Sequence, residues 1–294
     1  MADTEALARE FEQHRTRLTA VAYRMLGSLA EAEDVVQDAW LRFSTAGTER
    51  VDNIGAWLTT IVARLSLNAL RARRRRHEEP LEVFVPDPVI SSLDGIDPEQ
   101  ELLLADAVGI ALDVILDTLQ PAERLALVLH DMFDVPYDDI APMLGRTAVA
   151  TRQLASRARH RVRDVTPPQE SDPGLSREVV TAFFSAAHGG DLNQLISLLD
   201  PDVVLRSQGG PRRPAATALV RGAAAVASRA MMFRRPEAQL VPVLINGGPG
   251  VVILTAGEPI SVMSFTVADG RITEITALND PDRLARLDLS QIGR

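Results

Sequence analysis

The stretch PYDDIAPMLGRTAVATRQLASRARHRVR, residues 136–163, decides the fold of the segment around it. It predicts two short helices joined by a tight turn at Gly145, with Thr147 capping the second helix. Apolar residues recur at four-residue steps in that second helix and should form its buried face: Ala150, Leu154, Ala158 and Val162. The pattern is typical of a helix-turn-helix.

This second helix is strongly basic in a chain that is acidic overall. The 294 residues carry a net charge of −9, yet no acidic residue lies between Ile140 and Arg163. Outward arginines can bind phosphates or guanine edges, and a glutamine suits adenine, so the segment is expected to bind DNA. The alternative is a solvated basic helix in an ordinary bundle, but the turn residues and the missing acids favour DNA.

A second basic stretch lies earlier in the chain and ends at Arg71–Arg76. No acidic residue occurs from Asn53 to His77, and Trp57 and Asn68 precede or interleave with the arginines. Aromatic and polar residues beside a basic surface suit unstacked, single-stranded bases. The alternative interpretation is a basic helix end that favours its own dipole.

A third stretch is acidic and is expected on a helix that Ser28 caps. Asp34 and Asp38 are four residues apart, so they share one face, and Trp40 lies nearby. Such a face is either a protein-docking surface or a solvated one. Composition alone favours the solvated face.

Two segments without periodicity divide the chain: residues 78–98, rich in proline and acids, and residues 166–174. Outside residues 78–98, the pattern before residue 166 predicts helices. After residue 175, helices are followed by β-like segments that glycine-containing turns connect, which predicts a separate α+β domain. The expected strands are Val203–Arg206, Leu240–Ile245, Val251–Thr255, Ile260–Val267 and Arg271–Ala277.

Composition excludes several classes of site. There is no cysteine, so disulfides and thiolate metal sites are excluded. No apolar run approaches the roughly 20 residues that span a bilayer, and the first residues show no signal-peptide core. The sequence therefore predicts a cytoplasmic protein with no membrane, metal or cofactor requirement.

The three charged segments, in this order, resemble the extracytoplasmic-function (ECF) sigma factors of the sigma-70 family. AYRMLGSLAEAEDVVQDAWLRF is similar to their region 2.1–2.2, and WLTTIVARLSLNALRARRRR to region 2.3–2.4. LDTLQPAERLALVLHDMFDVPYDDIAPMLGRTAVATRQLASRARHRV is similar to region 4. The match covers most of residues 8–163. It implies region 2 in 1–77, a linker in 78–98 and region 4 in 99–165, which bind core RNA polymerase and promoter DNA.

The resemblance also assigns the contact residues. Core polymerase would be held by Glu33, Asp34, Gln37, Asp38, Trp40 and Leu41. The promoter −10 element would be contacted by Trp57, Arg64, Asn68, Arg71, Arg74 and Arg75. The −35 element would be contacted by Arg146, Thr147, Thr151, Arg152, Gln153, Ser156, Arg157 and Arg159.

After the linker at 166–174, residues 175–294 are similar to the SnoaL-like cone domain of the SigJ-like group. That group carries a DGGGK-type loop and an NPDKL-type motif, which match QGGPR (208–212) and DPDRL (280–284) here. Gln208 replaces an aspartate and Pro211 a glycine. The resemblance implies a tail that regulates the sigma factor in place of a separate anti-sigma factor, with a pocket open to a small ligand. Its regulatory residues would be Gln208, Gly209, Gly210, Arg212, Pro281, Asp282, Arg283 and Leu284, in contact with regions 2 and 4.

An enzyme and a DNA-binding repressor are the two alternative functions. SnoaL-like domains can be cyclases or isomerases, but the one histidine after residue 163 is His188, and Glu274 is the one acid within an expected strand. No convergent acid–base pair is visible, so no catalytic residue is assigned. A DNA-binding repressor that never meets polymerase is disfavoured by the EDVVQD helix and by the basic, aromatic stretch after Asn53.

Overall fold

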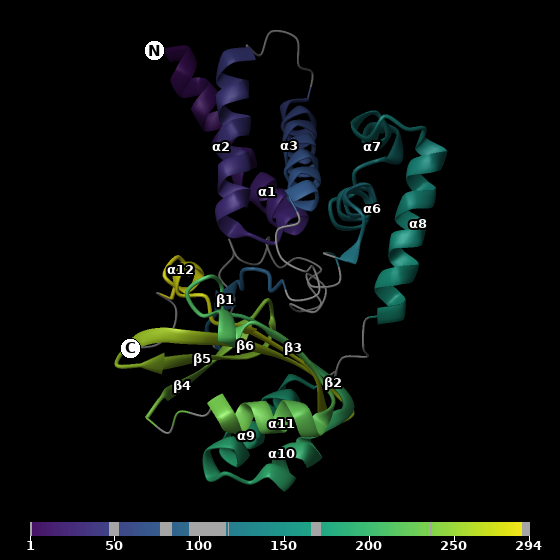
Figure 1. The fold of residues 1–294 in the computed structure, drawn as a ribbon. Coiled ribbons are helices and arrows are strands. Elements are labelled where there is room, and N and C mark those ends of the chain that lie inside the picture. Colours follow the sequence, from purple (N-terminus) through teal and green to yellow (C-terminus); the bar gives the residue numbers. More distant parts are fainter. Residues whose placement is uncertain are drawn as a thin grey trace. The chain divides into compact units, whose positions relative to one another are not determined.

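The computed structural model describes residues 2–46, 53–76, 84–93, 116, 118–165, 172–233, 235 and 237–289 (Figure 1). These residues form two compact units. The first contains the helices before residue 77 and those between 118 and 165. The second contains residues 84–93 and everything described from residue 172 onward. The predicted class is confirmed: helical regions are followed by an α+β domain.

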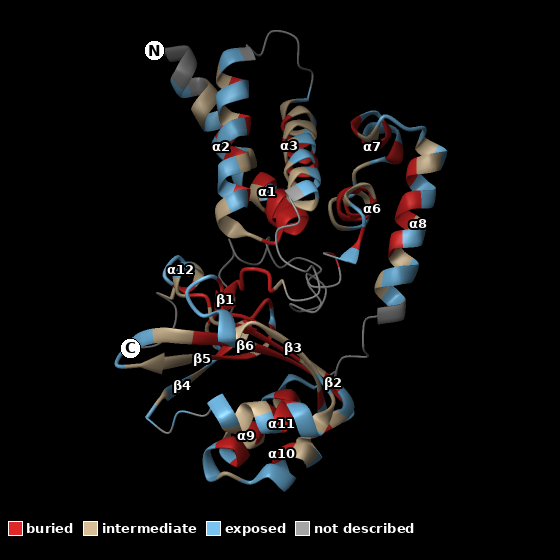
Figure 2. Cartoon of the chain, viewed as in Figure 1, coloured by how far each residue is buried: buried red, intermediate tan, exposed pale blue. Residues whose placement is uncertain are grey.

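The first unit begins with three helices, α1 (Ala2–Leu26), α2 (Leu29–Ala46) and α3 (Ile54–Arg76). Ser28 Oγ accepts the backbone N–H of Glu31 at the start of α2, and Asn53 Oδ1 accepts that of Ala56 at the start of α3. All three helices carry buried residues (Figure 2), among them Leu18, Tyr23, Phe43, Leu58 and Leu67, which form the core between them.

The same unit continues with α6 (Pro121–Leu127), a π-helical turn η1 (Val128–Met132), α7 (Tyr137–Leu144) and α8 (Ala148–Val165). Gly145 closes α7 with φ 63°, a left-handed conformation that glycine adopts at little cost. Thr147 Oγ1 then accepts the N–H of Ala150 and caps α8. The predicted helix-turn-helix is confirmed as α7, the turn and α8.

Arginines join the two groups of helices within this unit. The Nε of the buried Arg124 in α6 donates to the carbonyl of Arg24 over 2.9 Å. Arg17 Nη2 donates to the carbonyl of Phe133 over 2.7 Å. α1–α3 and α6–α8 therefore pack against each other directly.

The second unit is built on a seven-stranded sheet in the order β1-β4-β5-β6-β7-β2-β3. Its strands are β1 (Ile90–Ser91), β2 (Leu199–Gln208), β3 (Ala218–Arg221), β4 (Gln239–Ile245), β5 (Gly248–Thr255), β6 (Glu258–Ala268) and β7 (Arg271–Leu278). Neighbouring strands are antiparallel except β2 and β7, which are parallel. All five expected strands are present, and each is longer than the sequence indicated.

Helices α9 (Pro173–Gly189), α10 (Leu192–Leu198) and α11 (Ala223–Phe233) cover one face of this sheet (Figure 1). An apolar cluster that includes Phe183, Leu205 and Phe265 fills the space between helices and sheet. A second cluster includes Val85, Ile90, Val243 and Leu284, the last from the short helix α12 (Pro281–Leu284). A 3-10 turn, η2 (Pro214–Ala216), precedes β3.

The expected linker departs from the prediction in its described part. Residues 84–93 belong to the second unit, and β1 pairs with β4, aligning Ile90 with Ile245. Val89 N–H donates to Asn246 Oδ1 over 2.7 Å. Strand β4 would otherwise be an open edge with unpaired backbone groups, and this segment satisfies part of it. Residues 78–83, 94–98 and 166–171 of the two expected linkers lie outside the described residues.

Candidate nucleic-acid and protein interfaces

Helix α3 carries a polar stripe along its whole length. Residues spaced three or four apart share a helical face, and those at 57, 60, 64, 68, 71 and 75 follow this spacing. Arg64, Asn68, Arg71 and Arg75 are exposed. Trp57 is half-buried, with its ring centroid 5.9 Å from that of Phe43. Five of the six residues expected at the −10 element therefore lie on one continuous surface, which also includes Thr60.

Arg74 departs from that stripe. Its guanidinium donates to the carbonyl of Leu119 over 2.9 Å and to the side chain of Gln120. Its neighbour Arg73 bonds the carbonyl of Leu26 and the carboxylate of Glu31. In this structure both arginines hold α3 to neighbouring elements, so Arg74 lies off the stripe and its contact with DNA stays a prediction.

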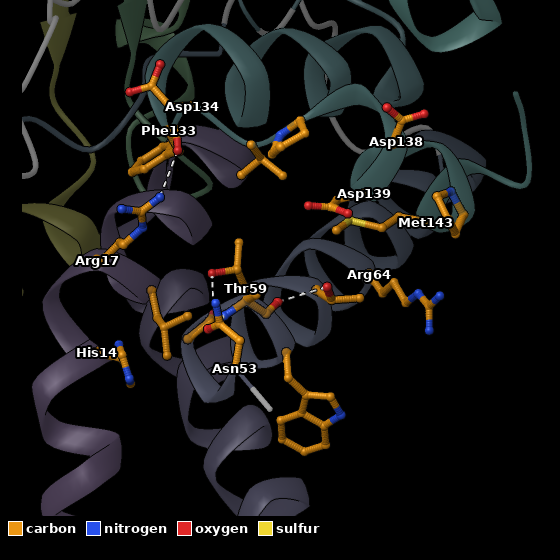
Figure 3. A pocket seen from close by; sticks show the side chains of 18 residues that line it. His14, Arg17, Asn53, Thr59, Arg64, Phe133, Asp134, Asp138, Asp139 and Met143 are labelled. Carbon is orange, nitrogen blue, oxygen red and sulfur yellow. Dashed lines mark hydrogen bonds between the residues drawn. The ribbon is translucent and has the colours of Figure 1, made fainter. Parts of the chain in front are cut away.

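The first half of the stripe opens into a cleft of about 650 Å³ within the first unit (Figure 3). Trp57, Thr60 and Arg64 line it from α3. Acidic side chains line it from the η1–α7 segment: Asp134, Asp138 and Asp139. The cleft therefore places carboxylates opposite a surface expected to receive phosphates.

Helix α8 exposes a different set of side chains at its start. Arg146, Thr147, Arg152, Gln153 and Arg157 are exposed, and Ser156 is half-buried. The Arg152 guanidinium lies over the Tyr137 ring, 5.4 Å from its centroid, which restricts the directions that this side chain can take. Six of the eight residues expected at the −35 element thus lie at or near the solvent face.

The remaining two residues of that set make contacts within the first unit. Thr151 is completely buried, and its hydroxyl donates to the carbonyl of Thr147 over 3.0 Å. Arg159 pairs through two nitrogens with Asp131 and donates to Tyr137 Oη over 2.6 Å. The hydrogen bond from Asp131 raises the pKa of the Arg159 guanidinium further above its ordinary value. The buried Thr151 does not present its side chain to DNA, which corrects that expectation, whereas Arg159 is partly exposed and its DNA contact stays a prediction.

Two further exposed residues of α8 were not expected from the sequence. Val149 and His160 lie on the same solvent face as Gln153. A full helical projection of residues 147–163 would have found them, because 149, 153, 156 and 160 repeat at three- and four-residue steps. The acid-free arginine pattern drew attention to charge instead.

Helix α2 presents the acidic surface. Glu33, Asp34, Gln37 and Asp38 are exposed, and Leu41 is 54% exposed among them. An exposed leucine on an acidic helix face is an apolar contact point with a charged border, the arrangement found at many protein interfaces. Trp40 is half-buried instead and packs edge-on against Phe11, with ring centroids 5.2 Å apart.

In the second unit, the loop after β2 and the segment at α12 contact each other and residues 84–87. Gln208 Oε1 accepts the N–H of Val85 over 3.0 Å and Nη1 of Arg283 over 2.6 Å. Arg283 also bonds Asp87 and lies over the Phe84 ring, 5.5 Å from its centroid. Arg283 is thus the centre of a contact between tail and linker.

Glycine is required where these two segments approach. Gly210 has φ 64°, and a Cβ there would come within 2.1 Å of the Asp280 carboxylate. Asp280 accepts the N–H of Asp282 and caps α12, while Asp282 pairs with Arg212 over 2.9 Å. The resemblance implied that these segments contact regions 2 and 4. Their described contacts run to each other and to the linker.

The one strand acid considered for catalysis is engaged in an ion pair. Glu274 Oε1 lies 3.0 Å from Arg206 Nε, and both side chains are largely buried. Burial raises the pKa of Glu274, and the neighbouring Arg206 opposes that shift. His188 is exposed at the end of α9. Among the described residues, no three potential metal-ligating side chains lie together.

Comparisons with known proteins agree with this arrangement. Residues 11–76 match the family Sigma-70 region 2, and residues 110–162 match Sigma-70, region 4. The chain is 36% identical to the ECF RNA polymerase sigma factor SigJ of Mycobacterium tuberculosis, over 96% of this chain and 94% of that protein. The chain belongs to the ECF sigma factors.

Relatives also cover the tail of this sigma factor. It is 31% identical to the probable ECF sigma factor SigI of M. tuberculosis, over 97% of both chains. The crystal structure of M. tuberculosis SigJ superposes with a TM-score of 0.75 at 33% identity, covering 96% of this chain and 99% of that one. The C-terminal α+β domain is therefore an integral part of this type of sigma factor.

Membership of the family establishes the activity at the level of class. The sigma factor directs promoter-specific initiation by RNA polymerase and binds the core enzyme and promoter DNA. Sigma factors are a family of non-enzymatic proteins. None of the helices in the described part of the chain is long and apolar enough to cross a membrane.

Proposed function

We propose that this sigma factor divides its contacts among three helices. The acidic face of α2 binds core polymerase, the stripe of α3 binds the −10 element as single-stranded DNA, and the start of α8 binds the −35 element in the major groove. The exposed Leu41 beside Asp34 and Asp38 supports the first contact. The aromatic and basic stripe supports the second, and the capped, exposed start of α8 supports the third.

The polymerase contact is tested by charge reversal. Asp38 is exposed on α2, so Asp38→Arg leaves the fold intact and places a cation where the partner is expected to be basic. We expect reduced co-purification with core polymerase. Glu178→Arg is the matched control because it makes the same charge change on the exposed face of α9. Equal co-purification of both variants and the unmodified protein would refute the assignment.

We propose further that the tail regulates initiation by holding the linker. Arg283 carries this proposal, because it contacts Phe84, Asp87 and Gln208 at once. Residues 84–91 bound to the tail are no longer available as free chain between regions 2 and 4. The tail therefore limits the separation that these two DNA-binding regions can reach.

The regulation is tested by releasing the linker. Arg283→Ala removes the stacking on Phe84 and the bonds to Asp87 and Gln208, so we expect run-off transcription with core polymerase to rise, as it would after truncation at Asp280. We expect proteolysis within residues 84–93 to become faster. Arg286→Ala, which removes an exposed arginine two residues after the end of α12, is the control. Unchanged transcription and proteolysis for Arg283→Ala would contradict the proposal.

A further inference from the structure

One exposed side chain of α8 has no role in the fold or in the charge pattern. Among the described residues of α6, α7 and α8, Val149 is the one large hydrophobic side chain that is exposed, at 64%. Burying a valine side chain is worth about 1.5–3 kcal/mol. Val149 does not gain that free energy within the fold. The exposed side chains three or four positions away belong to Arg146, Arg152 and Gln153.

The position of Val149 within the helix points to a partner. Thr147 caps α8, so Val149 is the second helical residue and lies one turn before Arg152 and Gln153. Residues at the start of a recognition helix are those that reach base edges in the major groove. The flanking Ala148 and Ala150 are small, so they do not keep the valine away from a surface.

The chemistry of the groove then selects the contact. A valine side chain makes no hydrogen bond, and the apolar group on a base edge in the major groove is the C5-methyl of thymine. Valine in a helix also has one strongly preferred χ1 rotamer, so little side-chain entropy is lost on contact.

We infer that Val149 is a specificity-determining residue of this sigma factor, packing its methyl groups on a thymine methyl of the −35 element. The thymine lies next to the base pair that Arg152 or Gln153 contacts. This inference rests on the proposed −35 role of α8. It adds an apolar determinant to a helix whose other candidate contacts are polar.

The test removes the methyl group from the DNA and the valine from the protein. A −35 element is first selected with holoenzyme from a randomised promoter pool, and each thymine in turn is replaced by deoxyuridine. At one thymine, we expect holoenzyme affinity to fall about fourfold, the value of one buried methyl group. Holoenzyme with Val149→Ala should show the lower affinity on both DNAs and no difference between them.

Arg152→Ala separates this inference from the proposed function. If Arg152→Ala weakens promoter binding and Val149→Ala still distinguishes thymine from deoxyuridine, the inference is overturned and the −35 role of α8 stands. If neither substitution affects promoter binding, the −35 role itself fails. A selected element without thymine, or Val149→Ala weakening polymerase binding with unchanged base preference, also overturns the inference. Because Val149 is exposed, thermal unfolding of the variant should match that of the unmodified protein.

Discussion

Helices α3 and α8 both carry clusters of arginines, but their surroundings treat those arginines differently. In α8, Arg159 pairs with Asp131 and Arg161 with Glu123, carboxylates that lie outside the helix. In α3, Arg73 likewise pairs with Glu31 of α2, whereas Arg74 meets a backbone carbonyl and a neutral amide. Carboxylates therefore neutralise part of the positive charge in the second half of α8, whereas the two partners of Arg74 carry no charge.

The difference teaches that an acid-free run of sequence is not an acid-free surface. The carboxylates that neutralise α8 come from 28 and 38 residues earlier in the chain. What remains for DNA is the exposed start of α8, suited to a few directed contacts. The α3 stripe is longer and suited to following a flexible strand by charge. The following expectations test this division.

The largest effect is expected at the start of α8. Arg152→Ala should weaken binding of holoenzyme to its selected promoter by about 1–3 kcal/mol, the range for loss of a bidentate base contact. Binding competition between matched and altered −35 elements measures it. Arg163→Ala, at the exposed far end of α8, is the control and should lower affinity equally for both DNAs. Equal losses for Arg152→Ala would remove the distinction between the two helices.

A smaller and less sequence-dependent effect is expected on α3. Arg64→Ala combined with Arg71→Ala should lower affinity for single-stranded −10 DNA about tenfold, and the slope of log affinity against log salt should fall by about 1.4. Arg9→Ala combined with Arg15→Ala removes the same charge from α1 and is the control. A salt slope that stays constant would show that these arginines do not contact phosphates.

The smallest effect is expected on stability. Arg159→Ala should lower the free energy of unfolding by about 1 kcal/mol, because the ion pair with Asp131 is partly exposed. Thermal unfolding measures it, and Asp131→Asn should act in the same direction. We expect base preference at the −35 element to change little. An altered preference with unaltered unfolding would return Arg159 to the DNA surface.

Local patterns predicted much of this molecule, and distant pairings account for what they missed. The bounds of α11 and the turn at Gly145 follow from residues close in sequence. No local pattern predicts strand β1 in the linker, because Pro86 and Pro88 interrupt any periodicity. Its partner Asn246 lies 157 residues away from Val89. Strand β3 is only four residues long, too short to show alternation.

In the candidate interfaces, too, local spacing predicts some features and contacts between distant residues decide the others. Exposure of Asp34, Asp38 and Arg152 follows from helical spacing alone. The roles of Arg74 and Arg159 depend on Leu119 and Asp131, which the sequence separates from them by 45 and 28 residues. Helical spacing says which way a side chain points, but it does not say what stands there.

The bonds between α1–α3 and α6–α8 set an equilibrium on promoter engagement. Elements named −10 and −35 are about 25 base pairs apart, roughly 85 Å along B-form DNA at 3.4 Å per pair. The hydrogen bonds from Arg17 to Phe133 and from Arg124 to Arg24 must break before the two groups of helices can move apart. A net 0.5–1.5 kcal/mol for a typical hydrogen bond makes this closure a matter of a few kcal/mol. If the closed arrangement is favoured about 99 to 1, a core enzyme that binds the open arrangement about 10⁴-fold more tightly would reverse that ratio.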